Sequence, residues 1–228
     1  MPSLFPPAPI VMLPVSGSDD MFPVRRVYCV GRNYAAHAIE MGGDPDREAP
    51  FFFQKNPDNL TLTDGIFPYP SQSSDVHHEV ELVVALHRGG RDIAVDTALD
   101  HVFGYAVGID FTRRDRQAEA KAAGRPWEVA KAFEQSGPLS PLVPASRIGH
   151  PTEGRIWLSV NDTPRQDGNV NQMSWKVPEI IAELSRLFTL APGDVIFTGT
   201  PSGVGPVERG DRVTCGVEGV AALAVSVR

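Results

Sequence analysis

The chain has 228 residues and carries 21 Lys and Arg against 28 Asp and Glu, so its formal net charge is −7. Because 42% of its residues are hydrophobic, it can bury a sizeable core, which excludes intrinsic disorder as its main state. The negative charge argues against a nucleic-acid partner, which would favour basic stripes. No apolar run approaches the ~18 residues of a membrane span, so we expect no membrane partner.

Residues 1–23 are rich in proline and are predicted to form an extended N-terminal arm, followed by a single domain over 24–228. Prolines interrupt the early apolar stretch and the first basic residue is Arg25, a pattern that is not typical of a signal peptide. The two cysteines, Cys29 and Cys215, do not make a disulfide framework. We therefore expect a cytoplasmic protein.

Hydrophobic patterning predicts many short strands and few helices. The clearest strand signal covers residues 78–86, and further strands are expected over 26–30, 51–53, 103–109, 155–160 and 195–198, with two more within 211–227. Helices are expected over 34–41, where Gly42-Gly43 would end the helix, and over 95–102, 112–123 and 178–188. Short strands separated by turns predict a mostly β chain with some α, an α+β fold.

Three acidic residues suggest a metal site. Glu79 and Glu81 lie two apart on a predicted strand and therefore point to the same face. Burying two adjacent carboxylates costs several kcal/mol unless a cation compensates. Asp110 ends the apolar run 103–109 and could join them, and three carboxylates would suit Mg²⁺ or Mn²⁺. The alternatives are a solvated strand face for the glutamates and a helix N-cap for Asp110.

A histidine and a glutamate form a second candidate pair. His37 and Glu40 lie three apart, so they are neighbours on one face of a helix. The carboxylate could orient and polarise the imidazole, which is the arrangement that a general base needs to activate water. The alternative is an ordinary exposed helix pair.

Five further polar residues are candidates for contacts with a substrate. Lys131 could neutralise a developing oxyanion or enolate, or it could be a surface lysine whose stem packs on a tryptophan. Arg114 and Gln117 lie three apart on a predicted helix and could reach the same site, or they could form a solvated face. Thr200, in a Gly-rich turn, and Lys55 could each hold a substrate carboxylate; the alternatives are simple turn chemistry and a surface position.

Taken together, these pieces resemble the fumarylacetoacetate hydrolase superfamily. The matching stretches are 31–37 (GRNYAAH) with Glu40, 77–82 (HHEVEL), 108–117 (GIDFTRRDRQ), Pro126-Trp127 with 131–133, Asn161, and 190–205 (LAPGDVIFTGTPSGVG). They occur in the order of the family and cover about residues 24–228. Within the superfamily, the Pro-rich arm before 22–30 and the segment 50–55 are similar to the bacterial fumarylpyruvate hydrolases of gentisate degradation.

The resemblance implies a mixed β-sandwich roll with the site at one mouth, and a homodimer. It implies that Glu79, Glu81 and Asp110 hold Mg²⁺ or Mn²⁺. The His37–Glu40 pair would activate water on a segment that acts as a lid. It also implies four residues that contact the substrate or stabilise its enolate: Lys131, Gln117, Arg114 and Thr200.

The implied reaction is hydrolysis of the C–C bond of an acylpyruvate, a small diketo acid. Its most direct form converts fumarylpyruvate to fumarate and pyruvate. One alternative is decarboxylation of oxaloacetate or a related keto acid, or enol–keto isomerisation, on the same scaffold. A more remote alternative is a non-catalytic, metal-stabilised binding module, which would have no use for a water-activating pair.

Overall fold

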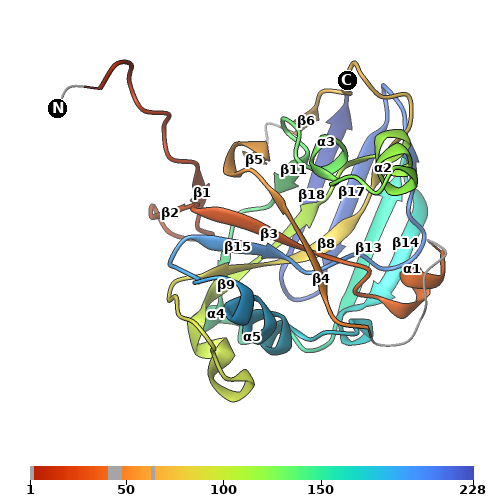
Figure 1. Cartoon of the computed structure of the whole chain (residues 1–228). Helices are drawn as coiled ribbons and strands as arrows, with labels where there is room; N and C mark the ends of the chain where they lie inside the picture. Colours follow the sequence, from red (N-terminus) through yellow and green to blue (C-terminus); the bar gives the residue numbers. More distant parts are fainter. Residues whose placement is uncertain (1–2, 41–47, 63–64) are drawn as a thin grey trace.

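The computed structural model describes residues 3–40, 48–62 and 65–228 and arranges them in four β-sheets with helices around them (Figure 1). The largest sheet has eight strands. From one edge to the other they are β4 (Phe51–Lys55), β3 (Arg26–Gly31), β15 (Asp194–Phe197), β8 (Val80–Leu86), β9 (Val102–Ile109), β11 (Gly137–Leu139) and β5 (Leu60–Leu62), with β12 (Val143–Pro144) paired to β9.

The second large sheet has five strands and lies against the first, with its strands crossing those of β3 and β8 in the view of Figure 1. In order they are β14 (Thr163–Asn169), β13 (Arg155–Val160), β17 (Arg212–Val217), β18 (Ala221–Val227) and β6 (Ile66–Phe67). Two small sheets complete the set: β10 (Thr112–Arg113), β7 (Val76–His78) and β16 (Gly205–Val207), and the hairpin of β1 (Met12–Pro14) with β2 (Met21–Pro23). The α+β fold predicted from the sequence is confirmed.

Strand β8 divides the interior into two apolar cores, because successive side chains of a strand point to opposite faces. Its even-numbered residues 80–86 join a core that includes Ile156 and Val213 of the five-stranded sheet. Val83 and Ala85 join the other core, which is closed by the N-terminal hairpin. All of β8 is buried, so its polar residue Glu81 is carried into the interior with it.

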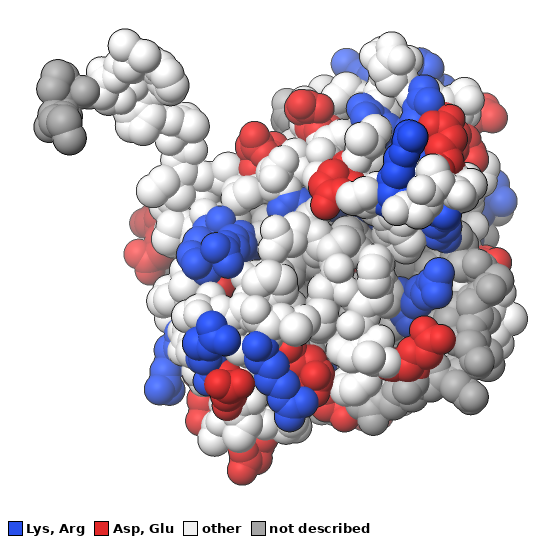
Figure 2. Space-filling view, in the orientation of Figure 1, with Lys and Arg blue, Asp and Glu red and all other residues white. Residues whose placement is uncertain are grey.

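The hairpin ties the start of the chain to the body. Leu13 is fully buried and Phe22 is 7% exposed, and both belong to the second core. Residues before the hairpin project away from the body (Figure 1 and Figure 2), and Leu4 and Phe5 are exposed. Residues 12–23 therefore pack against the large sheet, and the free part of the predicted arm ends before β1.

The helices are short and lie around the sheets. They are α1 (Ala35–Glu40), α2 (Arg114–Ala122), α3 (Glu128–Lys131), α4 (Ala145–Ile148) and α5 (Val177–Leu187), with 3₁₀ turns η1 (Pro57–Asn59), η2 (Val95–His101) and η3 (Val170–Gln172). Helix α5 buries the apolar stripe that its sequence predicts, including Ile180 and Leu184. None of the described helices is long and apolar enough to cross a membrane.

The structure differs from the sequence-based elements at particular points. The strand predicted over 78–86 breaks at Glu79, the segment predicted as a helix over 95–102 is a 3₁₀ helix, and the polar helix begins at Arg114. Strand β14 was not predicted, because its sequence TPRQDGN is polar and contains proline; the turn at Asn161-Asp162, with φ of 49° and 61°, pairs it with β13. Met41 and Gly42-Gly43, the predicted helix end, lie outside the described residues.

Candidate active site

Three carboxylates meet at one end of the central strand pair. Strands β8 and β9 are antiparallel, with Val80 opposite Ile109, so the start of β8 and the end of β9 lie together. Glu79 immediately precedes β8, and Asp110 immediately follows β9. The Asp110 amide donates a 2.8 Å hydrogen bond to the Glu79 carbonyl, which continues the pairing past both strands. This register brings together residues that are 31 positions apart along the chain (110 − 79).

The cluster is buried and compact. Glu79, Glu81 and Asp110 are 5%, 2% and 0% exposed, and each offers a carboxylate oxygen within 4.8 Å of the others. The solvated-face alternative for the glutamates is therefore wrong. The N-cap alternative for Asp110 is also wrong, because α2 begins at Arg114 with Arg113 at its N-cap. Three hard oxygen donors at this spacing fit a divalent cation such as Mg²⁺ or Mn²⁺.

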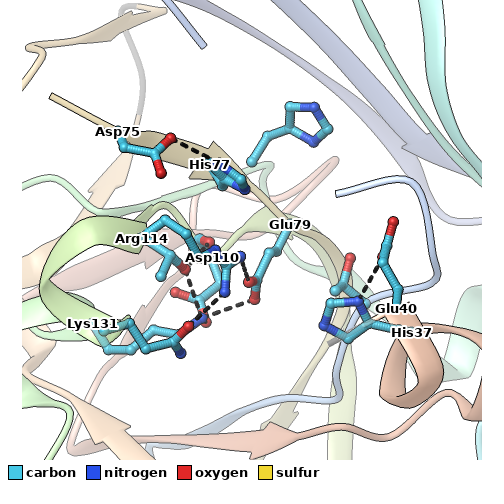
Figure 3. A network of polar contacts seen from close by, with 12 residues as sticks. His37, Glu40, Asp75, His77, Glu79, Asp110, Arg114 and Lys131 are labelled. Carbon is cyan, nitrogen blue, oxygen red and sulfur yellow. Dashed lines mark hydrogen bonds and ion pairs between the residues drawn. The ribbon is translucent and has the colours of Figure 1, made fainter. Parts of the chain in front are cut away.

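Three basic side chains contact the carboxylates, and two of them, Arg114 and Lys131, are labelled in Figure 3. The Lys131 ammonium lies 2.8 Å from Glu79 Oε2 and 2.7 Å from Asp110 Oδ2. Arg114 Nη2 donates to Glu79 Oε1 at 2.5 Å, and Lys55 Nζ lies 2.8 Å from Asp110 Oδ1. Although burial raises the pKa of Glu79, the positive charges of Lys131 and Arg114 hold that pKa below its ordinary value.

Glu81 is the member of the cluster without a cation. Among the described residues it forms no ion pair, and its Oε2 accepts a 2.6 Å hydrogen bond from the Gly199 amide. Burial, together with the negative charges of Asp110 and Glu79, raises the pKa of Glu81 well above its ordinary value. A buried carboxylate that faces two others, with no cationic partner among the described residues, has the chemistry of a ligand for a cation.

The histidine and glutamate predicted as a pair do meet, on the opposite side of Glu79 from Lys131 (Figure 3). His37 is 5% exposed, and its Nδ1 lies 3.1 Å from Glu40 Oε2. A hydrogen bond to a carboxylate fixes the tautomer in which Nδ1 carries the proton and Nε2 has a free lone pair. His37 lines the same cavity as Glu79 and Glu81.

A Gly-rich segment after β15 holds several of these groups in place. The Gly203 amide donates to both oxygens of Glu40, at 3.1 and 3.3 Å. Gly203 has a φ of +92°, and a Cβ there would lie 2.0 Å from the Arg165 carbonyl oxygen, so only glycine fits. Thr200 Oγ1 accepts a 2.8 Å hydrogen bond from Gln166 Nε2, and the Thr200 side chain lines the cavity.

An open cavity borders the carboxylates of Glu79 and Glu81. Its polar lining includes most of the residues predicted from the sequence: His37, Glu79, Glu81, Arg114, Gln117, Lys131 and Thr200. Lys55 does not line it; it is 2% exposed and donates to Ser136 Oγ at 2.8 Å and to the Lys131 carbonyl. Lys131 is likewise buried, so the surface-lysine alternative for it is wrong, and the lysine that lies over Trp127 is Lys121, at 5.3 Å.

Sequence reasoning missed several residues at the site. Gln166, on β14, is 1% exposed, and besides Thr200 it bonds the Val80 amide through Oε1. Arg32, Lys121, Phe53 and Trp127 line the cavity and were not singled out. For Lys121 a signal was available, since it lies one helical turn beyond Gln117 on the same face of α2.

The family of the chain is shown by its similarity to known proteins. Residues 26–228 match the family described as "Fumarylacetoacetate (FAA) hydrolase C-terminal". The crystal structure of fumarylpyruvate hydrolase from Pseudomonas aeruginosa in complex with Mn²⁺ and pyruvate is 51% identical in sequence, superposes with a TM-score of 0.97, and is matched over 99% of both chains.

Other relatives carry different names. A mitochondrial oxaloacetate decarboxylase from Dictyostelium discoideum is 44% identical over 198 residues, which is 86% of this chain and 90% of that protein. A mitochondrial oxaloacetate tautomerase from Arabidopsis thaliana is 41% identical over 202 residues, covering 89% of this chain and 90% of that one. Family members thus act on keto acids by more than one reaction. On the evidence of its sequence, its fold and its relatives, this chain belongs to the fumarylacetoacetate hydrolase family.

Proposed function

We propose that this chain is a hydrolase that depends on a divalent metal ion and cleaves the C–C bond of acylpyruvates, with fumarylpyruvate as its substrate and fumarate and pyruvate as its products. The observation that carries the proposal is the pairing of an uncompensated buried carboxylate, Glu81, with an oriented histidine, His37, across one cavity. The buried Glu81 carboxylate requires a cation, and the His37 imidazole is oriented to act as a base toward water.

Charge balance supports an anionic substrate. Glu79, Glu81 and Asp110 contribute three negative charges, and Lys55, Arg114 and Lys131 contribute three positive ones. A divalent cation held by Glu79, Glu81 and Asp110 would therefore leave the site positive, which favours a diketo acid with ionised carboxyl groups. Such an ion, Mg²⁺ or Mn²⁺, would act as a Lewis acid toward the keto acid end of the substrate.

The protein's own groups account for the proton movements. His37 Nε2 takes a proton from water while Glu40 holds Nδ1–H, and the resulting hydroxide adds to the carbonyl carbon of the acyl group. The three N–H groups of Lys131 donate to Glu79, Asp110 and Thr112, and its positive charge would stabilise the negative oxygen that forms there. The bond between that carbon and the neighbouring methylene then breaks, the methylene carbon takes the proton that His37 holds, and the acyl group leaves as a carboxylic acid that ionises to the carboxylate.

The remaining residues bind and position. Arg114, Gln117 and Thr200 border the cavity and would hold the pyruvate end of the substrate. For Lys55 the proposal replaces the expected substrate contact with neutralisation of Asp110, because its ammonium is enclosed between Asp110 and Ser136. The proposal keeps the expectation of a cytoplasmic homodimer, which fractionation and light scattering of the purified protein would test.

A second candidate is favoured by the names of relatives at 40–44% identity, which are oxaloacetate decarboxylases and tautomerases. One comparison separates the two. The Mn²⁺-loaded protein is given fumarylpyruvate, whose absorbance falls on cleavage, and separately oxaloacetate, from which pyruvate formation and enol absorbance are followed. We expect faster turnover of fumarylpyruvate by at least about tenfold in kcat/KM. Faster turnover of oxaloacetate would refute the hydrolase proposal, and no turnover of either would favour a binding module.

A further inference from the structure

The cavity has a second charged region, beyond the groups that the proposed reaction uses. Arg32 and Lys121 line the cavity, and within the described residues neither side chain forms a hydrogen bond or an ion pair. The Lys121 ammonium contacts the Trp127 ring at 5.3 Å. Lys121 is half-buried and has no carboxylate partner among the described residues, which is unusual for a lysine, while Arg32 is exposed and lines the same cavity.

The electrostatic surroundings of Lys121 are unfavourable for a cation. Burial lowers its pKa, and the positive charges of Arg114 and Arg32 lower it further. Arg32 also has a φ of 56°, a conformation that costs a non-glycine residue about 1 kcal/mol or more. The chain therefore brings Arg32, Arg114 and Lys121 together at some energetic cost, which an anion bound between them would offset.

Helix α2 places these cations in a row that leads away from the carboxylates. Arg114 begins the helix and contacts Glu79, Gln117 follows on the same face, and Lys121 lies in the last turn. Seven residues separate the ends of this row, which corresponds to about 10 Å along a helix axis. The row is thus long enough for a substrate whose keto acid end lies by Arg114 and whose far end reaches Lys121.

The wall between the two ends is aromatic. Phe53 and Trp127 both line the cavity, with ring centroids 5.9 Å apart. Phe51 packs edge-on against Trp127 at 4.9 Å and supports it from outside. Flat aromatic faces favour a flat, conjugated chain over a bulky or tetrahedral one.

We infer that Lys121 and Arg32 bind a carboxylate at the far end of the acyl chain, and that Phe53 and Trp127 hold a planar unsaturated segment before it. The inference rests on the proposed function and narrows its substrate class to acylpyruvates that end in a second carboxylate. Short keto diacids such as oxaloacetate place their second carboxylate too close to the keto acid end to reach Lys121. Lys121 and Arg32 are thus specificity-determining residues for long diacids.

The test compares two substrates with the same pyruvate end: fumarylpyruvate, whose acyl group has an unsaturated chain that ends in a carboxylate, and acetylpyruvate, whose acyl group has a methyl group in place of that chain. Steady-state kinetics of the Mn²⁺-loaded protein are measured for the wild type, Lys121→Met and Arg32→Gln. In each variant we expect the ratio of kcat/KM for fumarylpyruvate to that for acetylpyruvate to fall about tenfold or more, mainly through a higher KM. Lys121→Arg should retain the preference, because it keeps the charge.

Arg125→Met is the matched control, since Arg125 is an exposed basic residue just after α2 and does not line this cavity. It should leave both substrates unaffected. Inhibition by fumarate gives an independent readout, and its inhibition constant should rise in Lys121→Met.

Equal losses on both substrates, or no change in either, would overturn the inference. The activity of the wild type on the two substrates distinguishes failure of the carboxylate subsite from failure of the proposed function. If it cleaves acetylpyruvate as well as fumarylpyruvate, the hydrolase function stands and the carboxylate subsite is refuted. If it releases pyruvate from neither, the proposed function fails and the inference fails with it.

Discussion

Replacing Glu81 by glutamine tests the metal site without relying on catalysis. The carboxylate oxygens of Glu79, Glu81 and Asp110 lie within 4.8 Å of one another, and at an effective dielectric constant of 20 two charges at that distance repel by about 3 kcal/mol. Lys131 offsets part of this repulsion through Glu79 and Asp110, but Glu81 has no cation of its own among the described residues. Glutamine keeps the shape and can still accept the hydrogen bond from Gly199.

Two opposite effects follow from the same substitution. Without metal, Glu81→Gln should unfold at a temperature roughly 2–4 °C higher than the wild type, because removing the repelled charge stabilises by about 1 kcal/mol or more. With Mn²⁺ at a hundred times its dissociation constant, the wild type should gain about 2.7 kcal/mol, or roughly 5–11 °C. The variant should gain less than about 2 °C, because it has lost a charged ligand.

The measurement is differential scanning calorimetry with and without Mn²⁺ after chelator treatment. Glu153→Gln is the matched control, since Glu153 is exposed and far from the cluster in sequence and contacts; it should respond to the metal as the wild type does. An undiminished response to Mn²⁺ in Glu81→Gln would refute the metal site. A metal-free variant less stable than the wild type would refute the argument that Glu81 is held at an electrostatic cost.

Further predictions concern the base and the thiols. His37→Ala should lower kcat for fumarylpyruvate by about 10²-fold or more while the thermal shift with Mn²⁺ persists; loss of that shift would instead make His37 a ligand. Gly203→Ala should lower kcat and stability together, by about 2 kcal/mol or more in unfolding free energy, because its Cβ would meet the Arg165 carbonyl and displace the amide that holds Glu40; wild-type values would contradict this. Removing metal with a chelator should abolish pyruvate release, and Mn²⁺ should restore it. Burial raises the pKa of both Cys29 and Cys215, so thiol reagents should modify neither in the folded protein, as mass spectrometry would show.

Local patterns predicted the parts of the site that depend on local geometry. The two-residue period of a strand placed Glu79 and Glu81 on one face, and their carboxylates do lie together, although the strand breaks at Glu79. The three-residue spacing on a helix paired His37 with Glu40. Asp110 was expected to join the glutamates because it ends a strand, and the antiparallel pairing of β8 with β9 is what makes that expectation hold.

Contacts between distant segments could not be read from such patterns. The Gly203 amide reaches Glu40 across 163 positions of sequence, and Gln166 reaches His78 across 88. The strand that carries Gln166 is polar and contains proline, so its sequence resembles a loop. The environment of Lys55 could not be predicted either, because the residues that enclose its ammonium, Asp110 and Ser136, are distant from it in the sequence.

The hydrogen bonds that orient His37 through Glu40 help to decide which reaction the chain performs. Loss of carbon dioxide from a keto acid needs a cation near the keto group, but it needs no base aimed at water. Here Glu40 is fixed at both ends of its carboxylate, by His37 Nδ1 and by the amide of Gly203, a position where only glycine fits. Such support costs conformational freedom in two segments of the chain, and it is useful only if the imidazole must keep one tautomer and one direction. A reaction that begins by deprotonating water has that requirement, and for this reason we favour hydrolysis over decarboxylation.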